Sequence, residues 1–203
     1  MGAILEAAHY RIQLTPEEFL DWLDEDDKAE LIGGEVVMAS PASAWHQTVE
    51  MFLGTILNLF VRRMGIGRVY DSQFVMRLGK NVFMPDVMFI SNERLADCQP
   101  TYLKGPADLV MEIVSPESEE RDRKRKFTAY EAGGVREYWL FVLATREISA
   151  FSLGPKRKYR KIAPDKGGAV YSTVVQGFFV RPAWVWTDPP DELGALKELG
   201  VRI

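Results

Sequence analysis

The chain has 203 residues, 47% of them hydrophobic and 27% charged, which is typical of a soluble globular protein. Its net charge of −4 argues against a protein that coats nucleic acid with its whole surface, so any such contact must come from a local basic patch. No stretch approaches the roughly 18 apolar residues of a membrane span, and the single cysteine, Cys98, makes a reduced, cytoplasmic compartment the default expectation.

The chain is expected to begin with a loose leader, residues 1–14, followed by one domain over residues 15–203. Thr15 suits the position before a helix, Pro16 suits the first helical position, and Glu18 completes a capping box. Apolar residues then recur at helical spacing, so a short helix is predicted.

A strand, a tight turn and a second strand are predicted over residues 29–41, because apolar runs flank Gly33 and Gly34. A long helix then begins at Ser40 or Ser43. One of its faces is expected to pack against the core, through apolar residues that recur every three or four positions: Val49, Phe52, Leu53, Ile56, Leu59 and Phe60.

The middle of the chain alternates between strand and helix signals. Residues 67–80 and 81–91 are expected to form a hairpin that turns where they meet. A buried strand is predicted at 108–114, a helix at 115–134 and another buried strand at 136–143. This order implies a parallel crossover within a mixed sheet.

Alternating patterns predict antiparallel strands in residues 147–153, 156–164 and 168–180, and a short helix at 191–200. The predicted fold class is therefore α/β or α+β, with one central mixed sheet flanked by helices.

Two carboxylates stand inside apolar strand-like sequences, Asp86 in "NVFMPDVMFI" and Glu112 in "LVMEIV". An ionised carboxylate is costly there unless something pairs with it. Side chains alternate between the faces of a strand, so two neighbouring strands could point both acids at one spot. Mg²⁺ or Mn²⁺ would relieve their repulsion, and a protonated or salt-bridged structural pair is the alternative.

The predicted helix at 115–134 follows the Glu112 strand directly and supplies a cation. Asp122, Lys126 and Tyr130 are four residues apart and lie on one helix face, whereas Lys124 points about 200° away. Lys126 is therefore the better candidate to reach the two acids, and Lys124 is the fallback. The alternative is that Lys126 is a solvated residue on a charged helix face.

These motifs resemble the PD-(D/E)XK nuclease superfamily, and more closely its Uma family of restriction-endonuclease-like proteins. The matching stretches are "PDV" (85–87), "MEIVSP" (111–116) and "RDRKRKFTAYEAGGVREYWL" (121–140), together with "ELIGGEVVMASPASAWH" (30–46). The resemblance spans roughly residues 17–145. It implies a restriction-endonuclease-like fold and metal-dependent hydrolysis of phosphodiester bonds in nucleic acid, with DNA as the expected substrate.

By this resemblance, Asp86 is the metal-binding aspartate, Glu112 the second acid and Glu30 an additional acid, so these three are the expected ligands of Mg²⁺ or Mn²⁺. The superfamily usually places a lysine two residues after the second acid, where this chain has Val114. Lys126 fits a lysine supplied from the following helix. It is the expected third catalytic residue with Asp86 and Glu112, and would stabilise developing charge or orient the attacking water.

Contact with nucleic acid is expected from "KRKYRK" (156–161), where Lys156, Lys158 and Arg160 would share one face of a strand. The alternative is an edge strand protected by lysines. His46, near the start of the long helix, is interpreted as a capping or packing residue rather than a ligand.

Two functions remain open besides the endonuclease. The chain could be a non-catalytic nucleic-acid-binding or assembly module that retains the nuclease fold, an interpretation favoured by the missing lysine at Val114. It could also hydrolyse a small phosphate ester. A homodimer is plausible for the endonuclease, because many nucleases of this fold dimerise to cut both strands.

Overall fold

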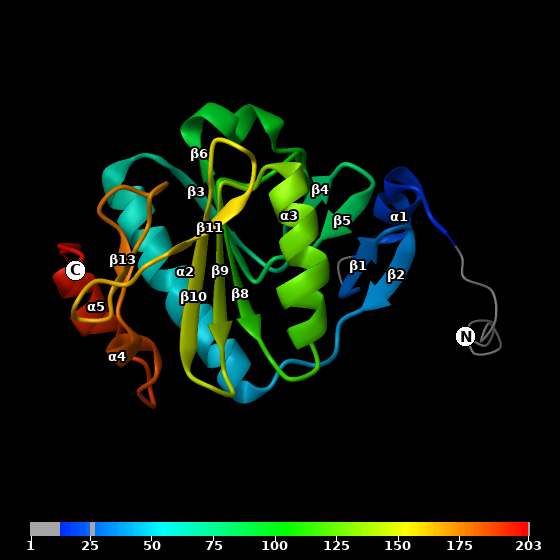
Figure 1. Cartoon of the computed structure of the whole chain (residues 1–203). Helices are drawn as coiled ribbons and strands as arrows, with labels where there is room; N and C mark the ends of the chain where they lie inside the picture. The colour runs from blue at the N-terminus through cyan, green and yellow to red at the C-terminus, as the bar shows by residue number, and fades with distance from the viewer. Residues whose placement is uncertain (1–12, 25–26, 203) are drawn as a thin grey trace.

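The computed structural model of the protein describes residues 13–24 and 27–202 (Figure 1). A central six-stranded sheet is covered on one face by α2 (Ala44–Met64) and on the other by α3 (Phe127–Gly133). A second sheet lies on the α3 side of the molecule, and the C-terminal elements lie beside α2. The expected leader, residues 1–14, falls almost entirely outside the described residues, and the division of the chain into leader and one domain stays a prediction.

The six-stranded sheet has β8 and β9 near its centre. These strands pair in parallel, and every residue of both is buried, which explains their continuous apolar sequences. The parallel crossover through α3 is therefore confirmed. In order across the sheet, the strands are β11 (Tyr159–Ile162), β10 (Glu147–Leu153), β9 (Glu137–Val142), β8 (Leu109–Val114), β6 (Val87–Ser91) and β3 (Gly67–Asp71).

A second sheet has five strands, and the sequence patterns do not predict it as a separate sheet. One of its strands, β7, lies between the predicted hairpin and the predicted strand at 108–114, where no strand was predicted. In order across this sheet, the strands are β2 (Glu35–Met38), β1 (Ala29–Ile32), β5 (Asn81–Phe83), β4 (Val75–Leu78) and β7 (Tyr102–Lys104). The mixed α/β class is confirmed, but its strands are divided between sheets.

The predicted helices are present. In α1 (Pro16–Trp22), Thr15 and Glu18 form the expected capping box, and α2 begins after Ser43, whose side chain accepts a hydrogen bond from the His46 backbone N–H. A π-helical segment, η2, leads directly into α3. The remaining elements are η1 (Asn92–Asp97), η2 (Arg121–Lys126), β12 (Val170–Tyr171), β13 (Phe179–Val180), α4 (Pro182–Val185) and α5 (Glu192–Glu198).

The hairpin predicted over residues 67–91 is only half correct. Strands β4 and β5 do pair across the expected turn, but β3 and β6 belong to the other sheet. The chain crosses between the sheets at residues 84–86, where Pro85 has no N–H to donate to a strand ladder. The prediction that Asp86 lies inside a strand is therefore wrong, because Asp86 lies at this crossing, directly before β6.

The two faces of the central sheet belong to different hydrophobic clusters. From β8, Met111 and Ile113 pack into the cluster on the α2 side, whereas Val110 and Val114 pack into the cluster on the α3 side. Glu112 therefore faces the α3 side of the sheet. None of the helices in the described part of the chain combines the length and apolar character needed to cross a membrane.

Gly67 opens strand β3 where the backbone of β6 passes close by. A Cβ at this position would lie 2.1 Å from the Ile90 carbonyl oxygen and 2.7 Å from the Phe89 ring. We expect Gly67→Ala to lower the free energy of unfolding by about 1–3 kcal/mol, because β3 must shift away from β6. Urea denaturation followed by circular dichroism measures this change.

Gly54→Ala is the matched control in helix α2. A Cβ there would meet only Val87 Cγ2, at an ordinary contact distance of 3.9 Å. This variant should be more stable than the wild type by roughly 0.5–1 kcal/mol, since alanine is the better helix former. Equal stability of the two variants would contradict the packing described here.

Candidate functional site

Asp86 is held at the start of β6, an interior strand of the central sheet, by strand pairing. Val87 pairs with Met111, which brings Asp86 beside Glu112 and Ile113. The Asp86 carboxylate accepts a hydrogen bond of 2.6 Å from the Ile113 backbone N–H. Its side chain is nevertheless 17% exposed, so the carboxylate can be reached from solvent.

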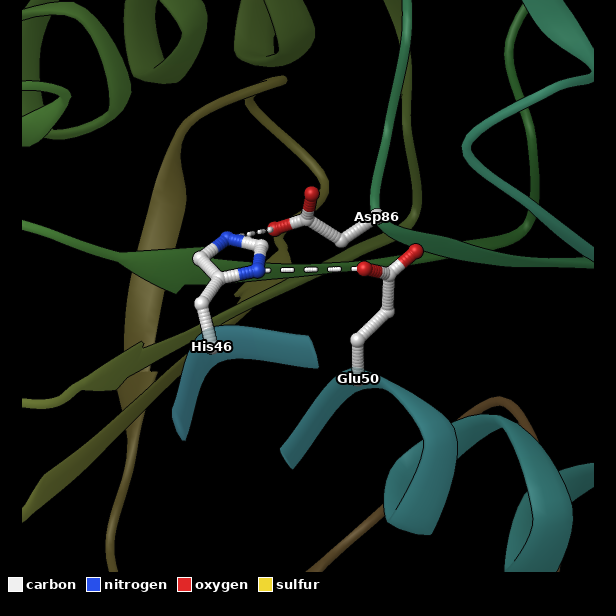
Figure 2. A group of neighbouring side chains, drawn as sticks. All are labelled: His46, Glu50 and Asp86. Atoms are coloured by element: carbon white, nitrogen blue, oxygen red, sulfur yellow. Dashed lines mark ion pairs between the residues drawn. The ribbon is translucent and has the colours of Figure 1, made fainter. Parts of the chain in front are cut away.

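Helix α2 places His46 and Glu50 against this aspartate (Figure 2). They are four residues apart, so their side chains lie on one helix face. His46 Nε2 is 3.5 Å from the Asp86 carboxylate, and His46 Nδ1 is 3.7 Å from the Glu50 carboxylate. One ligand atom from each of the three residues lies within 4.8 Å of the other two. Within residues 13–24 and 27–202, this is the group able to hold a metal ion.

The chemistry of this group fits a divalent cation. His46 Nδ1 is buried and has no hydrogen-bond partner among the described residues. An imidazole nitrogen with two carboxylates is a common donor set for metals such as Mn²⁺, and carboxylate oxygens also suit Mg²⁺. We call His46, Glu50 and Asp86 the metal triad.

The negative charge within the metal triad raises the pKa of His46 and of Glu50. Burial lowers the pKa of His46, but the hydrogen bond and charge of Asp86 and the charge of Glu50 outweigh it, so the pKa is raised overall. The pKa of Glu50 is raised by burial and by the negative charge of Asp86. The three residues thus concentrate negative charge that a cation or a proton on His46 would balance.

A second cluster surrounds the ammonium of Lys126 on the α3 side of the sheet. Lys126 Nζ lies 2.9 Å from Glu112, 2.9 Å from Glu30 and 3.7 Å from Asp122. The Tyr130 hydroxyl donates a 2.9 Å hydrogen bond to the same Glu112 oxygen, Oε1. The charged side chains of this lysine cluster are at most 4% exposed.

Burial and charge act in opposite directions on Lys126. Burial lowers the pKa of its ammonium, but the carboxylates of Glu112, Glu30 and Asp122 outweigh it, so the pKa is raised and the lysine is charged. Burial also raises the pKa of Glu112, against the opposing charge of Lys126. The charged Lys126 ammonium therefore lies beside Glu112 at physiological pH.

The structure brings together most residues that the sequence predicts for a site. Glu30, Glu112 and Lys126 are in direct contact, and the shared face of Asp122, Lys126 and Tyr130 is confirmed. Lys124 is exposed. Asp86 adjoins Glu112, but its carboxylate pairs with His46, which also pairs with Glu50. Metal ligation by Asp86, Glu112 and Glu30, and catalysis by Asp86, Glu112 and Lys126, stay predictions.

Sequence reasoning missed Glu50 and undervalued His46. The signal that could have found them is the spacing itself, because a histidine and a glutamate four residues apart present two ligands on one helix face. A second signal is position, since both lie in the first turns of the long helix. What the sequence does not show is that this helix end meets Asp86.

The basic stretch 156–161 is less regular than predicted. Strand β11 begins only at Tyr159, and Arg157 lies in a turn with a φ of 53°. Lys156 and Lys158 therefore do not share a strand face with Arg160, and that prediction is wrong. Lys158 is paired with Glu131 at 2.6 Å but remains largely exposed. Nucleic-acid contact by Lys156, Lys158 and Arg160 stays a prediction.

The fold is similar to that of a solved structure. A solved structure from Anabaena variabilis, described as a "putative nuclease belonging to DUF820", superposes with a TM-score of 0.72 over 85% of this chain and 97% of that one. The sequences are 16% identical, so this similarity establishes a shared fold.

The family is established by sequence. Residues 16–181 match the model of the Uma2 family, described as "Putative restriction endonuclease", and the chain belongs to this family. The uncharacterized protein slr1290 of Synechocystis sp. is 28% identical over 138 residues, which cover 66% of this chain and 70% of that protein.

The lysine cluster predicts a large effect of removing its one ammonium. Lys126→Met keeps much of the side-chain volume but leaves the buried Glu112 carboxylate without its ammonium partner, whereas Glu30 and Asp122 keep Arg121 at 3.5 Å. We expect it to lower the free energy of unfolding by about 3–5 kcal/mol, measured by urea denaturation. The matched variant Lys124→Met, at an exposed position, should change it by less than about 0.5 kcal/mol. Similar losses from both variants would contradict the role of Lys126.

Proposed function

We propose that this protein is a metal-dependent endonuclease that hydrolyses phosphodiester bonds of nucleic acid, with DNA as the first substrate to test. The observation that carries the proposal is the metal triad, whose Asp86 lies beside Glu112 of the neighbouring strand β8. Membership of the Uma2 family and the fold shared with the Anabaena variabilis protein support it.

The residues have separate tasks in this proposal. Asp86, with His46 and Glu50, would hold Mg²⁺ or Mn²⁺, and Glu112, buried on the other face of the sheet, adds negative charge behind them. A divalent cation bound there would polarise a phosphate oxygen and activate water for attack. Ile113 orients Asp86 through its backbone N–H. Lys126 holds the Glu112 carboxylate in place and supplies positive charge beside it.

Substrate and assembly complete the proposal. The exposed basic residues of the segment 156–161 would contact the phosphate backbone. Cleavage of both strands of a duplex requires two such sites, so a homodimer is the proposed active form.

One observation favours a second candidate function. The Lys126 ammonium is surrounded by carboxylates and is only 2% exposed, so it does not face solvent, where a substrate would bind. A non-catalytic nucleic-acid-binding or assembly module that keeps the fold would need no free lysine. Measurements of metal binding and of nucleic-acid cleavage distinguish the endonuclease from the non-catalytic module.

Metal binding can be tested without any substrate. Calorimetric titration of Mn²⁺ into the wild-type protein should show one binding event, and Asp86→Ala should weaken it at least about tenfold because Asp86 is a direct ligand. His46→Ala and Glu50→Gln should do the same if the metal triad binds the ion. Glu93→Gln, at an exposed position, is the control. Absence of binding by the wild type would favour the non-catalytic module.

Cleavage can be followed on supercoiled plasmid DNA in Mg²⁺ or Mn²⁺. We expect nicked and linear products, no products in EDTA, and a rate at least about 100-fold lower for Asp86→Asn, because this acid would hold the metal at the reacting phosphate. Glu93→Gln should cut at the wild-type rate. Cleavage that persists in EDTA would contradict a metal-dependent mechanism.

A further inference from the structure

A groove runs beside the metal triad, between α2 and the edge strand β3. It has a volume of about 590 Å³, and Glu50 belongs both to its wall and to the triad. The opposite wall is the segment 69–73, at the end of β3. The α2 wall consists of residues three or four positions apart on one helix face: Gln47, Glu50, Met51, Gly54, Thr55 and Asn58.

Gly54 lies in the middle of this wall, and the fold gives no packing reason for a glycine there. It occupies the interior of a 21-residue helix, where glycine is disfavoured relative to alanine. A Cβ would meet only Val87 Cγ2, at 3.9 Å. Val87 itself lines the groove. What the missing side chain provides is open space against the helix backbone.

The chemistry of the walls suits a neutral polar group. Gln47, Asn58 and Gln73 offer amides that can both donate and accept hydrogen bonds. Glu50 and Asp71 add negative charge, and Lys28 is the single basic residue that lines the groove. A phosphate is therefore disfavoured, whereas a nucleobase presents the donor and acceptor edges that asparagine and glutamine recognise.

We propose that this groove receives an unpaired nucleobase of the strand whose phosphate is bound at the metal triad. The inference rests on the proposed function and names its substrate class: single-stranded nucleic acid, or a duplex with a base out of the stack. A paired base cannot enter a groove between a helix and a strand without leaving its partner. Glu50 connects the two parts of the site, because it faces both.

The test places larger side chains at Gly54, in the α2 wall of the groove. Fluorescence anisotropy measures binding of a labelled single strand of about 12 nucleotides, in Ca²⁺, to the wild type, Gly54→Ala and Gly54→Leu. We expect affinity to fall with side-chain size, by about tenfold or more for leucine, although alanine makes the helix more stable. Met64→Leu, exposed on the same helix outside the groove, should bind like the wild type.

A second variant guards against misfolding of Gly54→Leu. Gln73 lies exposed in the turn after β3, so Gln73→Trp narrows the groove from the other wall without altering the helix. It should weaken single-strand binding as well, and neither variant should change binding of a fully paired hairpin. Wild-type affinity of both variants for the single strand, equal losses on single strand and hairpin, or no single-strand binding by the wild type would each overturn the proposal.

The outcome can be separated from that of the proposed function. If the wild type cleaves DNA with metal and Gly54→Leu cleaves every substrate at the wild-type rate, the endonuclease function is supported and the nucleobase groove is contradicted. If the wild type cleaves nothing but binds the single strand, and the variants that fill the groove bind it more weakly, the nucleobase groove is supported and the protein is a binding module.

Discussion

The buried ammonium of Lys126 is the interaction on which the rest of the structure depends. It joins Glu30 from the second sheet to Glu112 from the central sheet, and it comes from the helical segment that connects β8 to β9. Glu30 also accepts a hydrogen bond of 2.9 Å from the Met84 backbone N–H. One cation and two carboxylates therefore fix both sheets, the helix and the chain crossing relative to one another.

The crossing of the chain between the two sheets at residues 84–86 positions Asp86 in the candidate site. Because the chain leaves one sheet and enters the other there, Asp86 stands directly before β6 instead of inside a ladder. It can then face the α2 side while Glu112 faces the α3 side. Two charged groups are thus separated across one sheet: an acidic one, partly open to solvent, and a closed one neutralised from within.

This separation bears on how the site could work. Negative charge accumulates where a cation can enter, whereas the positive charge of Lys126 stays behind Glu112. The groove along α2 extends from the metal triad. A nucleic-acid strand bound there would contact acid and amide side chains, and Lys28 is the one lysine that lines the groove. Such a surface agrees with the net charge of −4 and with a phosphate contact mediated by metal.

Local signals predicted the elements well. The capping box at Thr15, the glycine turn at residues 33–34 and the apolar periodicity of α2 depend on neighbours in sequence, and all three are confirmed. The spacing of Asp122, Lys126 and Tyr130 predicted their common face for the same reason. Residues 67–80 were predicted as one arm of a hairpin but form two strands, β3 and β4, in different sheets, because nothing local marks the point where a chain changes sheets.

By itself, the sequence determined the family, the strand–helix–strand unit and the residues that need a charged partner, since burial of an acid in an apolar strand is costly wherever that strand lies. Only the tertiary structure decided which partners they meet. Lys126 contacts Glu112 and Glu30, and Asp86 lies beside His46 and Glu50. Side-chain contacts over such long sequence separations follow from the packing of whole elements and not from any local pattern.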